Sequence, residues 1–264
     1  VLPIVRKLIF EGRNKEAQRL IDANFLTQQH GMSYLTLGSL YLEFPEHQNA
    51  SGFYRDLNLE NATTTTRYQV DDVTYTRTTF ASFTDNVIIM HIKASKANAL
   101  NFTIAYNCPL VHKVNVQNDQ LTVTCQGKEQ EGLKAALRAE CQIQVKTNGT
   151  LRPAGNALQI NEGTEATLYI SAATNYVNYQ DVSADESRRT SEYLKRAMQI
   201  PYEKALKSHI AYYKKQFDRV RLTLPTGKTS QLETPKRIEN FGNGEDMAMA
   251  ALLFHYGRYL LISS

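Results

Sequence analysis

The alternation of apolar and polar residues between about residue 33 and residue 175 is the feature that most constrains the fold. Seven short segments there are rich in Val, Ile, Thr, Tyr and Phe, with a period of two: 66–70, 73–80, 87–92, 101–106, 121–125, 141–146 and 166–172. That period is typical of strands whose two faces meet different surroundings. Many short strands with few helices between them favour an antiparallel sandwich. At ~140 residues the region exceeds an immunoglobulin-sized sandwich of ~100, so we expect a large two-sheet sandwich.

The connections between these segments carry recognisable turn residues. Asp71-Asp72 fits a tight hairpin, and Gly149 and the Pro153/Gly155 region mark looser turns. The run of threonines at 63–66 is typical of the approach to a strand. The turn residues therefore agree with the sandwich.

Helical patterns flank the strand region on both sides. Apolar residues recur at helical spacing within 2–25, where Gly12 fits the end of a first helix and Asn14 the N-cap of a second. This pattern predicts a helical hairpin over residues 2–25.

The segment after the strands reads as two helices, a strand and a final apolar helix. Ser183 and Glu186 have the spacing of a capping box, which predicts a helix to about Ile200. Pro201 suits the start of the next helix. Residues 219–224 alternate again and predict a short strand, residues 225–235 a polar loop, and a helix is expected from near Asp246.

Composition excludes several classes of function. Lys and Arg exceed Asp and Glu by 30 to 26 in a chain of 264 residues, and these charges are interspersed. Because no basic stripe is present, we expect no nucleic-acid partner. No apolar run approaches the ~20 residues of a membrane span. Cys108, Cys125 and Cys141 form no CxxC pair and read as small buried hydrophobes, so they leave the compartment open.

No metal or cofactor is expected from the side chains that bind such groups. The histidines show no HExxH or other ligand spacing; they are His30, His47, His91, His112, His209 and His255. Gly227-Lys228-Thr229 lacks the earlier glycine of a phosphate-binding loop, since Leu222 stands in its place.

Glycosidase chemistry would require two carboxyl groups across the scissile bond, and no such pair stands out. The carboxylates considered are Glu11, Asp56, Glu60, Asp85, Glu186, Glu239 and Asp246. Salt bridges and helix-end charges account for each of them. The sequence alone therefore predicts no catalytic residue.

Several blocks, in this order, resemble glycoside hydrolase family 95, the α-L-fucosidase and α-L-galactosidase family. These blocks are residues 4–12 with Glu16-Ala17, residues 37–40 with 54–59, residues 73–77, 80–82 and 85–88, and residues 254–264. The last block, Phe254-His-Tyr-Gly-Arg-Tyr-Leu-Leu-Ile-Ser-Ser264, is the most specific and is similar to the first helix of the family's catalytic barrel. The order and spacing of the blocks carry the resemblance.

The resemblance implies a mainly β fold: a large antiparallel super-sandwich, a helical linker and the first helix of an (α/α)6 barrel. We expect an N-terminal domain over 1–178, including the hairpin 2–25. A linker with a returning strand would cover 179–236, and the start of the barrel 237–264. Because Asp246 to Ser264 reads as an unfinished apolar helix, the chain is expected to be the N-terminal part of a longer, truncated protein.

The family's activity, by the same resemblance, is inverting hydrolysis of terminal α-L-fucosides or α-L-galactosides in glycans. Its catalytic residues cannot be mapped here, so this part alone is expected to be inactive. Tyr256 and Arg258 are the candidate substrate-binding residues, because their helix leads to the active centre; barrel packing and a structural ion pair are the alternative. A non-catalytic carbohydrate-binding or structural β module, or a related sandwich-plus-barrel phosphorylase, remains open.

The resemblance also suggests where the parent protein acts and with what it associates. It points to gut-type bacteria that export glycan-degrading enzymes, so a periplasmic, secreted or cell-surface location is expected. The expected partner is an oligosaccharide or glycan, with association through the exposed barrel helix as a further expectation.

Overall fold

The computed structural model of the chain describes residues 1–26, 36–129, 132–244 and 246–264. His30 and the predicted start of the strand region near residue 33 lie outside these ranges. The strands within them are β1 Ser39–Glu43, β2 Ser51–Asn58, β3 Thr63–Val70, β4 Val73–Ser82, β5 Val87–Ala94, β6 Leu100–Asn107, β7 Val111–Gln117, β8 Gln120–Gln126, β9 Arg138–Thr147, β10 Thr150–Ala154, β11 Ala157–Gly163 and β12 Glu165–Thr174.

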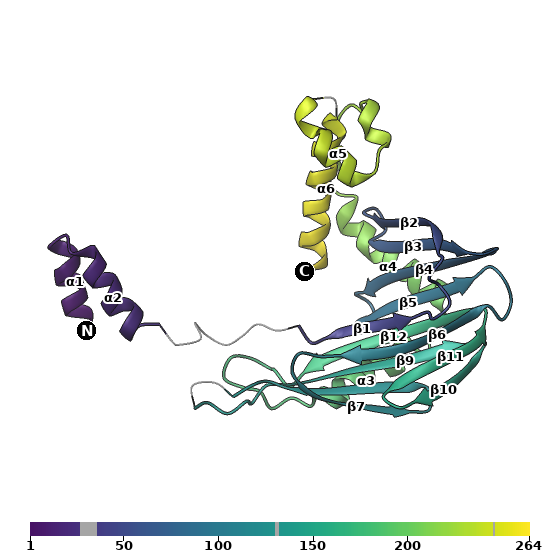
Figure 1. Ribbon diagram of the computed structural model, residues 1–264, viewed down its shortest axis with the longest axis horizontal. Coiled ribbons are helices and arrows are strands. Elements are labelled where there is room, and N and C mark those ends of the chain that lie inside the picture. Colours follow the sequence, from purple (N-terminus) through teal and green to yellow (C-terminus); the bar gives the residue numbers. More distant parts are fainter. Residues whose placement is uncertain (27–35, 130–131, 245) are drawn as a thin grey trace.

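The helices precede and follow the strands, as the sequence predicts. They are α1 Leu2–Phe10, α2 Asn14–Asn24, α3 Glu186–Ala197, α4 Tyr202–Phe217, α5 Thr234–Asn240 and α6 Met247–Ser263, with short 3-10 turns η1 Lys228–Gln231 and η2 Phe241–Asn243. The predicted hairpin is present as α1 and α2 (purple in Figure 1), which pack together through Val5, Leu8 and Ala17. Gly12 follows the end of α1 with φ +75°, the left-handed conformation expected there.

In the described ranges the strands form two antiparallel sheets (Figure 1). The larger has the order β2-β3-β4-β5-β12-β9-β8-β7, and the smaller has the order β1-β6-β11-β10. Asp71 and Asp72 join β3 to β4 in a two-residue turn, with Asp71 at φ 51°. The prediction of a mainly β, large antiparallel sandwich followed by helices is confirmed.

The main core lies between the two sheets because alternate residues of each strand face inward. Ile92 of β5, Ile143 of β9 and Leu168 of β12 meet Ile104 and Ile160 of the smaller sheet, and each is at most 1% exposed. Burying a large aliphatic side chain contributes about 1.5–3 kcal/mol. This core is therefore the main source of stability of the sandwich.

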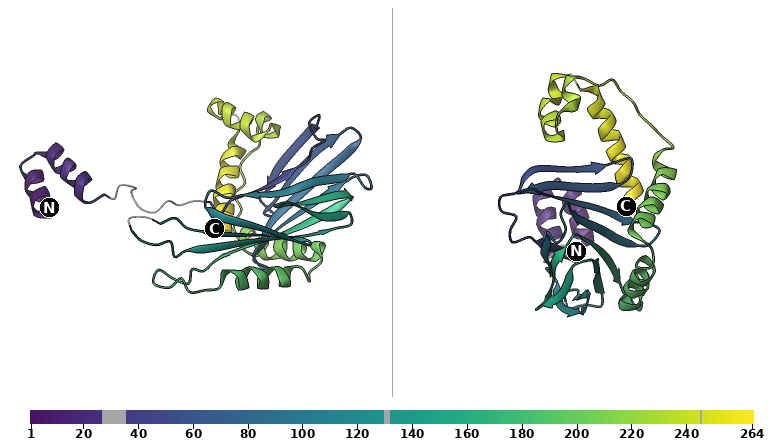
Figure 2. Two further views of the ribbon diagram at one scale, coloured as in Figure 1. Left: turned by 60° about the horizontal axis from the view of Figure 1, so that its bottom comes forward. Right: turned by 90° about the vertical axis from the view of Figure 1, so that its right-hand side faces the viewer.

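Two helices, α3 and α4, cover the central strands on the outer face of the larger sheet (Figure 2). Phe80, Ile89 and Tyr169 point to this face and pack against α3 and α4 through Leu194 and Ala205. Residues 166–169 of β12 are consequently buried on both faces. The two helices thus fix where the chain leaves the sandwich.

Two local predictions after the strands are wrong. The N-cap of α3 is Asp185 rather than Ser183, and its side chain accepts a hydrogen bond from the Arg188 amide at 2.9 Å. Ser183 lies before the helix, where its amide donates to the Asp181 carboxylate at 2.8 Å. The predicted returning strand at 219–224 is absent from the described secondary structure, because this segment hydrogen-bonds with side chains of α6 instead of with a strand.

The helices of the described residues were also compared with the dimensions of a bilayer. None of them combines the length and the apolar character needed to cross a membrane.

Candidate functional site

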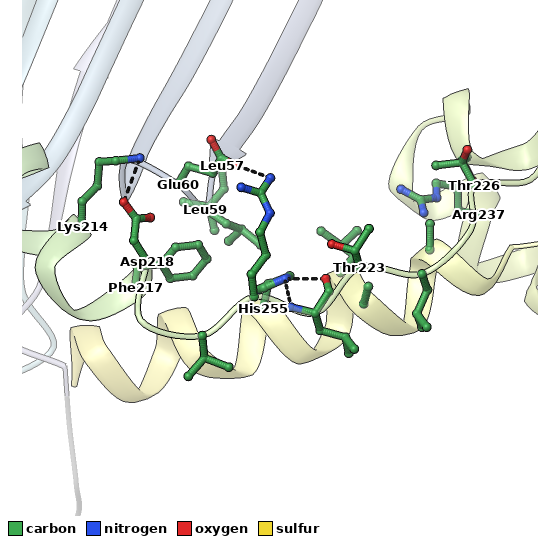
Figure 3. A pocket seen from close by; sticks show the side chains of 18 of the residues that line it. Leu57, Leu59, Glu60, Lys214, Phe217, Asp218, Thr223, Thr226, Arg237 and His255 are labelled. Atoms are coloured by element: carbon green, nitrogen blue, oxygen red, sulfur yellow. Dashed lines mark hydrogen bonds and ion pairs between the residues drawn. The ribbon is translucent and has the colours of Figure 1, made fainter.

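The candidate site is a groove of about 580 Å³ where the end of α4, the connector 218–227 and α6 meet the β2–β3 turn (Figure 3). The β2–β3 turn contributes Leu59 and Glu60, α4 contributes Phe217, and α6 contributes Ala251 and His255. The groove therefore lies between the sandwich and the last helix.

Two side chains of α4 fix this helix to the β2–β3 turn. The Tyr213 hydroxyl donates to the Leu59 carbonyl oxygen at 2.8 Å. His209 Nε2 lies 3.0 Å from the Asn61 carbonyl oxygen and 3.1 Å from that of Ala62, so Nε2 carries the ring proton. Ala62 has φ 50°, and these hydrogen bonds hold its backbone in that unfavourable conformation.

Burial changes the titration of both anchors. His209 is 2% exposed, and burial lowers its pKa because the charged imidazolium would lose its hydration. Burial raises the pKa of Tyr213 to about 12. Both side chains therefore remain neutral around pH 7, in the form that their hydrogen bonds need.

Arg258 and His255 of α6 hold the connector that lines the groove. Arg258 Nη1 donates to the carbonyl oxygens of Phe217 at 2.7 Å and Val220 at 2.8 Å, and Nη2 donates to that of Gln216 at 3.1 Å. The guanidinium also lies 4.9 Å from the centre of the Phe217 ring. It thus satisfies carbonyl groups at the end of α4 that have no partner inside the helix.

His255, one turn before Arg258 on α6, also contacts the backbone of the connector. Its Nε2 lies 3.0 Å from the Leu222 carbonyl oxygen and 3.3 Å from the Leu222 amide nitrogen, so it bonds one or the other according to its tautomer (Figure 3). His255 and Arg258 are three residues apart and therefore share one face of the helix.

The start of α6 is fixed by a buried ion pair. Arg237 Nε donates to Asp246 Oδ2 at 2.7 Å, and the Ser230 hydroxyl donates to Asp246 Oδ1 at 2.9 Å. Asp246 is also the N-cap, accepting from the Met249 amide at 3.2 Å. The Arg237 guanidinium, followed by the Ser230 hydroxyl, holds the pKa of Asp246 below its usual range, so the carboxylate stays ionised.

The carboxylates that line the groove are both paired. Glu60 lies 3.4 Å from Arg221, and Asp218 lies 3.4 Å from Lys214. These side chains are well exposed, so each ion pair contributes little to stability. Both carboxylates are engaged in these exposed ion pairs, so the described lining of the groove offers no pair of free carboxyl groups for hydrolysis.

The other carboxylates considered in the sequence are mostly held in local interactions. Glu11 pairs with Arg13 at 3.3 Å and Glu186 with Arg138 at 2.7 Å. Asp85 is buried and accepts from the Ser82 hydroxyl at 2.6 Å. The expectation that salt bridges and helix-end charges account for these carboxylates fits Glu11 and Glu186, whereas Asp85 is held by hydroxyl groups instead.

Tyr256 and Arg258, the predicted substrate-binding residues, lie on different faces of α6. Arg258 is turned toward the connector, where its donors are engaged by backbone carbonyls rather than by an ion-pair partner. Tyr256 is 42% exposed, and its ring lies 6.1 Å from that of Tyr259. A role of Tyr256 in sugar binding stays a prediction.

Several residues that build the groove were not singled out in the sequence. Phe217 and Tyr213 read only as the apolar face of α4, and Arg237 lay between the polar loop expected at 225–235 and the helix expected from near Asp246. The available signal was the one-turn spacing of His255 and Arg258 on an otherwise apolar helix. Two long polar side chains on one face of such a helix indicate a specific partner there.

Much of α6 remains uncovered although it is strongly apolar. Leu253 is 68% exposed and Leu261 is 80% exposed, while only Ala251 is fully buried. An amphipathic surface helix would instead bury such residues.

Clusters of His, Cys, Asp and Glu side chains are the usual protein ligands of metal ions. Throughout the described ranges, no group of three or more of these residues is arranged to hold a metal ion.

Family comparisons divide the chain close to where the sandwich gives way to the helices. Residues 1–179 match the family described as "Glycosyl hydrolase family 65, N-terminal domain". Residues 201–264 match the "Glycosyl hydrolase family 95 catalytic domain". The chain belongs to the glycoside hydrolases that carry a family 65 type N-terminal domain. The resemblance to family 95 inferred from the sequence is confirmed, and the chain joins a family 65 type N-terminal domain to a family 95 segment.

Curated relatives of this glycoside hydrolase chain include a plant and a fungal protein. The chain is 28% identical to alpha-L-fucosidase 2 of Arabidopsis thaliana over 98% of its own length. It is 24% identical to the probable alpha-fucosidase A of Aspergillus niger over its whole length. The chain spans 34% of each of these two relatives.

Among solved structures, the chain is similar to one provisionally named kojibiose phosphorylase, from the human microbiome. The likeness covers 62% of this chain and 23% of the other, at 10% identity and a TM-score of 0.43.

Proposed function

We propose that the chain is the N-terminal part of an inverting glycoside hydrolase that releases terminal α-L-fucose, or α-L-galactose, from glycans. The observation that carries the proposal is the extent of the two sequence matches. The Arabidopsis and Aspergillus fucosidases match 98% and 100% of this chain, whereas the chain spans 34% of each. The catalytic carboxylates are accordingly assigned to a part of the parent protein outside residues 1–264.

Within that parent, the proposed role of this part is to position the start of the catalytic domain. Catalysis by two opposed groups requires their placement to within fractions of an ångström. Tyr213 fixes α4 to the sandwich, and Arg258 fixes α6 to the end of α4. This chain of contacts would make the sandwich a rigid support for α6.

The exposed apolar side chains of α6 fit the same proposal. Leu253 and Leu261 would pack against further helices of the catalytic domain, which would remove their surface from water. In the absence of those helices the same face would promote association of the chain. We further propose that the parent acts outside the cytoplasm, a location that cell fractionation can test.

The decisive experiment is hydrolysis of paired chromogenic α-L-fucoside and α-L-galactoside substrates by the parent protein, extended through its catalytic domain. Release from either substrate, with the anomeric configuration inverted in the first product detected by NMR, supports the proposal and assigns the sugar. Residues 1–264 alone serve as the matched control and should release nothing.

Two other results would change the assignment. Sugar release that requires inorganic phosphate and yields a sugar phosphate would establish the phosphorylase alternative. Binding of the folded parent protein to a glycan array, without hydrolysis of the bound glycans, would establish the non-catalytic carbohydrate-binding module.

A further inference from the structure

Two cysteine thiols face each other across the sandwich core. Cys108 directly follows β6 of the smaller sheet, and Cys125 lies in β8 of the larger sheet. Their Sγ atoms are 3.4 Å apart, and both residues are buried, at 5% and 4% exposure. The pair therefore connects the two layers rather than two neighbouring strands of one layer.

The sulfur atoms are in van der Waals contact. A disulfide has an S–S distance of about 2.05 Å, so the gap must shorten by roughly 1.4 Å for a bond to form. The Leu110 amide donates to Cys108 Sγ at 3.4 Å and holds the thiol near its partner. The geometry thus brings the reacting atoms together before any bond forms.

The third cysteine stands in a different relation to Cys125. Cys141 lies in β9, where the residue opposite it in β8 is Val123, while the residue opposite Cys125 is Ala139. Within the described residues, the sulfur atoms in contact are those of Cys108 and Cys125. The register of β8 and β9 therefore favours one pairing and leaves Cys141 a thiol.

We propose that Cys108 and Cys125 form a disulfide that cross-links the two sheets when the protein meets an oxidising thiol–disulfide couple such as glutathione. The bond would close a loop between residues 17 positions apart, which contains β7 and most of β8. It would tie the β7–β8 hairpin at the edge of the larger sheet to β6 within the smaller one. This inference is independent of the proposed fucosidase activity.

The step is a two-electron oxidation of the protein with oxidised glutathione as the acceptor. One cysteine thiolate attacks a glutathione sulfur, which forms a mixed disulfide and releases one glutathione thiolate. The second cysteine thiolate then attacks the protein sulfur of that mixed disulfide and expels the other. The two thiol protons end on the two glutathione molecules released, so atoms and electrons balance.

Burial sets the rate at which this step occurs. Burial and the neighbouring Cys108 thiol raise the pKa of Cys125 to about 12, so the reactive thiolate is scarce in the folded protein. Exchange is therefore expected to be slow in the native state and fast during refolding, when both thiols meet solvent. The bond once formed would be shielded from reductants.

The test uses the full-length protein, refolded from denaturant in a glutathione redox buffer, with the remaining thiols alkylated before digestion. Mass spectrometry of the unreduced digest should show one cross-linked peptide joining Cys108 to Cys125, lighter by two hydrogen atoms than its reduced parts. Cys141 should be alkylated. Three alkylated cysteines in the refolded protein, or a link from Cys125 to Cys141, would overturn the proposal.

Matched variants give a second measurement. Closing a loop of about 18 residues should raise the melting temperature of the oxidised over the reduced protein by on the order of 5–10 °C. Cys141→Ala should retain this redox difference, whereas Cys108→Ala should lose it. Equal melting temperatures of oxidised and reduced protein would also contradict the proposal.

Discussion

Arg258 on α6 donates from Nη1 to the Phe217 carbonyl oxygen, 2.7 Å away at the last residue of α4. This contact links two helices that are separated in the chain by the connector 218–227 and by α5. The final helix is thereby attached to the end of α4 by hydrogen bonds from a side chain to backbone carbonyl oxygens, and not by a shared sheet. The contribution of these hydrogen bonds to the free energy of unfolding can be measured directly.

Arg258→Ala should weaken the attachment of α6 by about 2 kcal/mol, since three hydrogen bonds from a charged donor are lost at a partly exposed position. Chemical denaturation of the full-length protein measures the free energy of unfolding. The control is Arg221→Ala, whose side chain is 78% exposed and should change stability by less than about 0.5 kcal/mol. Equal effects of the two changes would refute the special role of Arg258.

Tyr256→Ala, in contrast, should affect activity rather than stability if Tyr256 contacts the sugar. Its ring is 42% exposed in the present chain. We expect kcat/KM of the full-length enzyme on the fucoside substrate to fall about tenfold or more, equivalent to about 1.4 kcal/mol, with an unchanged melting temperature. Tyr179→Ala, at 86% exposure, is the control. Unchanged kinetics would remove Tyr256 from the site.

His209 should make the protein less stable as the pH falls. Burial lowers its folded-state pKa, so the unfolded chain binds a proton that the native chain resists. The neutral His209 contributes fully above the unfolded pKa of about 6.5, and that contribution is lost as the pH falls toward the lower folded pKa. His209→Phe keeps a ring but leaves the Asn61 and Ala62 carbonyls without their donor, at a cost of about 1–3 kcal/mol.

The measurement for His209 is thermal unfolding of the wild-type protein and the variant from pH 7.5 to pH 5. The loss of stability with acid should be smaller in His209→Phe. A residual slope is expected from His91, whose pKa is likewise lowered by burial. Identical slopes for both proteins would contradict the assignment of His209 as a buried neutral group.

Asp246→Asn should lower the melting temperature at neutral pH and lose its effect in acid. The Arg237 guanidinium lowers the folded-state pKa of Asp246, so the stabilisation is present above the unfolded pKa of about 4 and is lost as the pH falls through the folded pKa. Melting curves at pH 7 and at pH 3 measure the difference. Asp22→Asn, at an exposed position of α2, is the control and should leave the melting temperature nearly unchanged at both values.

Leu168→Ala should be among the most damaging changes to the sandwich. The side chain is fully buried between the sheets, and such truncations cost about 2–5 kcal/mol through lost burial and the cavity left behind. Val111→Ala on the edge strand β7, at 69% exposure, should cost less than about 0.5 kcal/mol. A small effect at Leu168 would contradict its placement in the core between the two sheets.

The sequence predicted the strands β3, β4, β5, β6, β8, β9 and β12. It missed the edge strands β1, β2, β7 and β10, and also β11, which lies inside the smaller sheet. The segment 166–172 is recognisable because β12 is central in the larger sheet. β2 has mostly exposed side chains. β7 has Lys and Asn between its valines. β10 has only five residues, one of which is Pro153. Edge strands pack on fewer neighbours, so their composition is less constrained.

The candidate site was less predictable because its hydrogen bonds join residues far apart in the chain. The alternation of 219–224 was read as a strand, yet its partners are Arg258 and His255, 33 or more positions away. The local sequence does not reveal whether a backbone carbonyl will accept its hydrogen bond from a distant side chain or from a neighbouring strand. The role of Tyr256, and the division of the chain at 178 and 236, stay predictions.

Pro153, in β10 at one edge of the smaller sheet, has a consequence for strand addition from outside. It stands opposite Leu158 of β11 and has no N–H group to offer to a strand arriving from solution. A second polypeptide therefore cannot complete a regular ladder along this five-residue edge. The edge at β10 is thereby protected against fibril-like growth by strand addition.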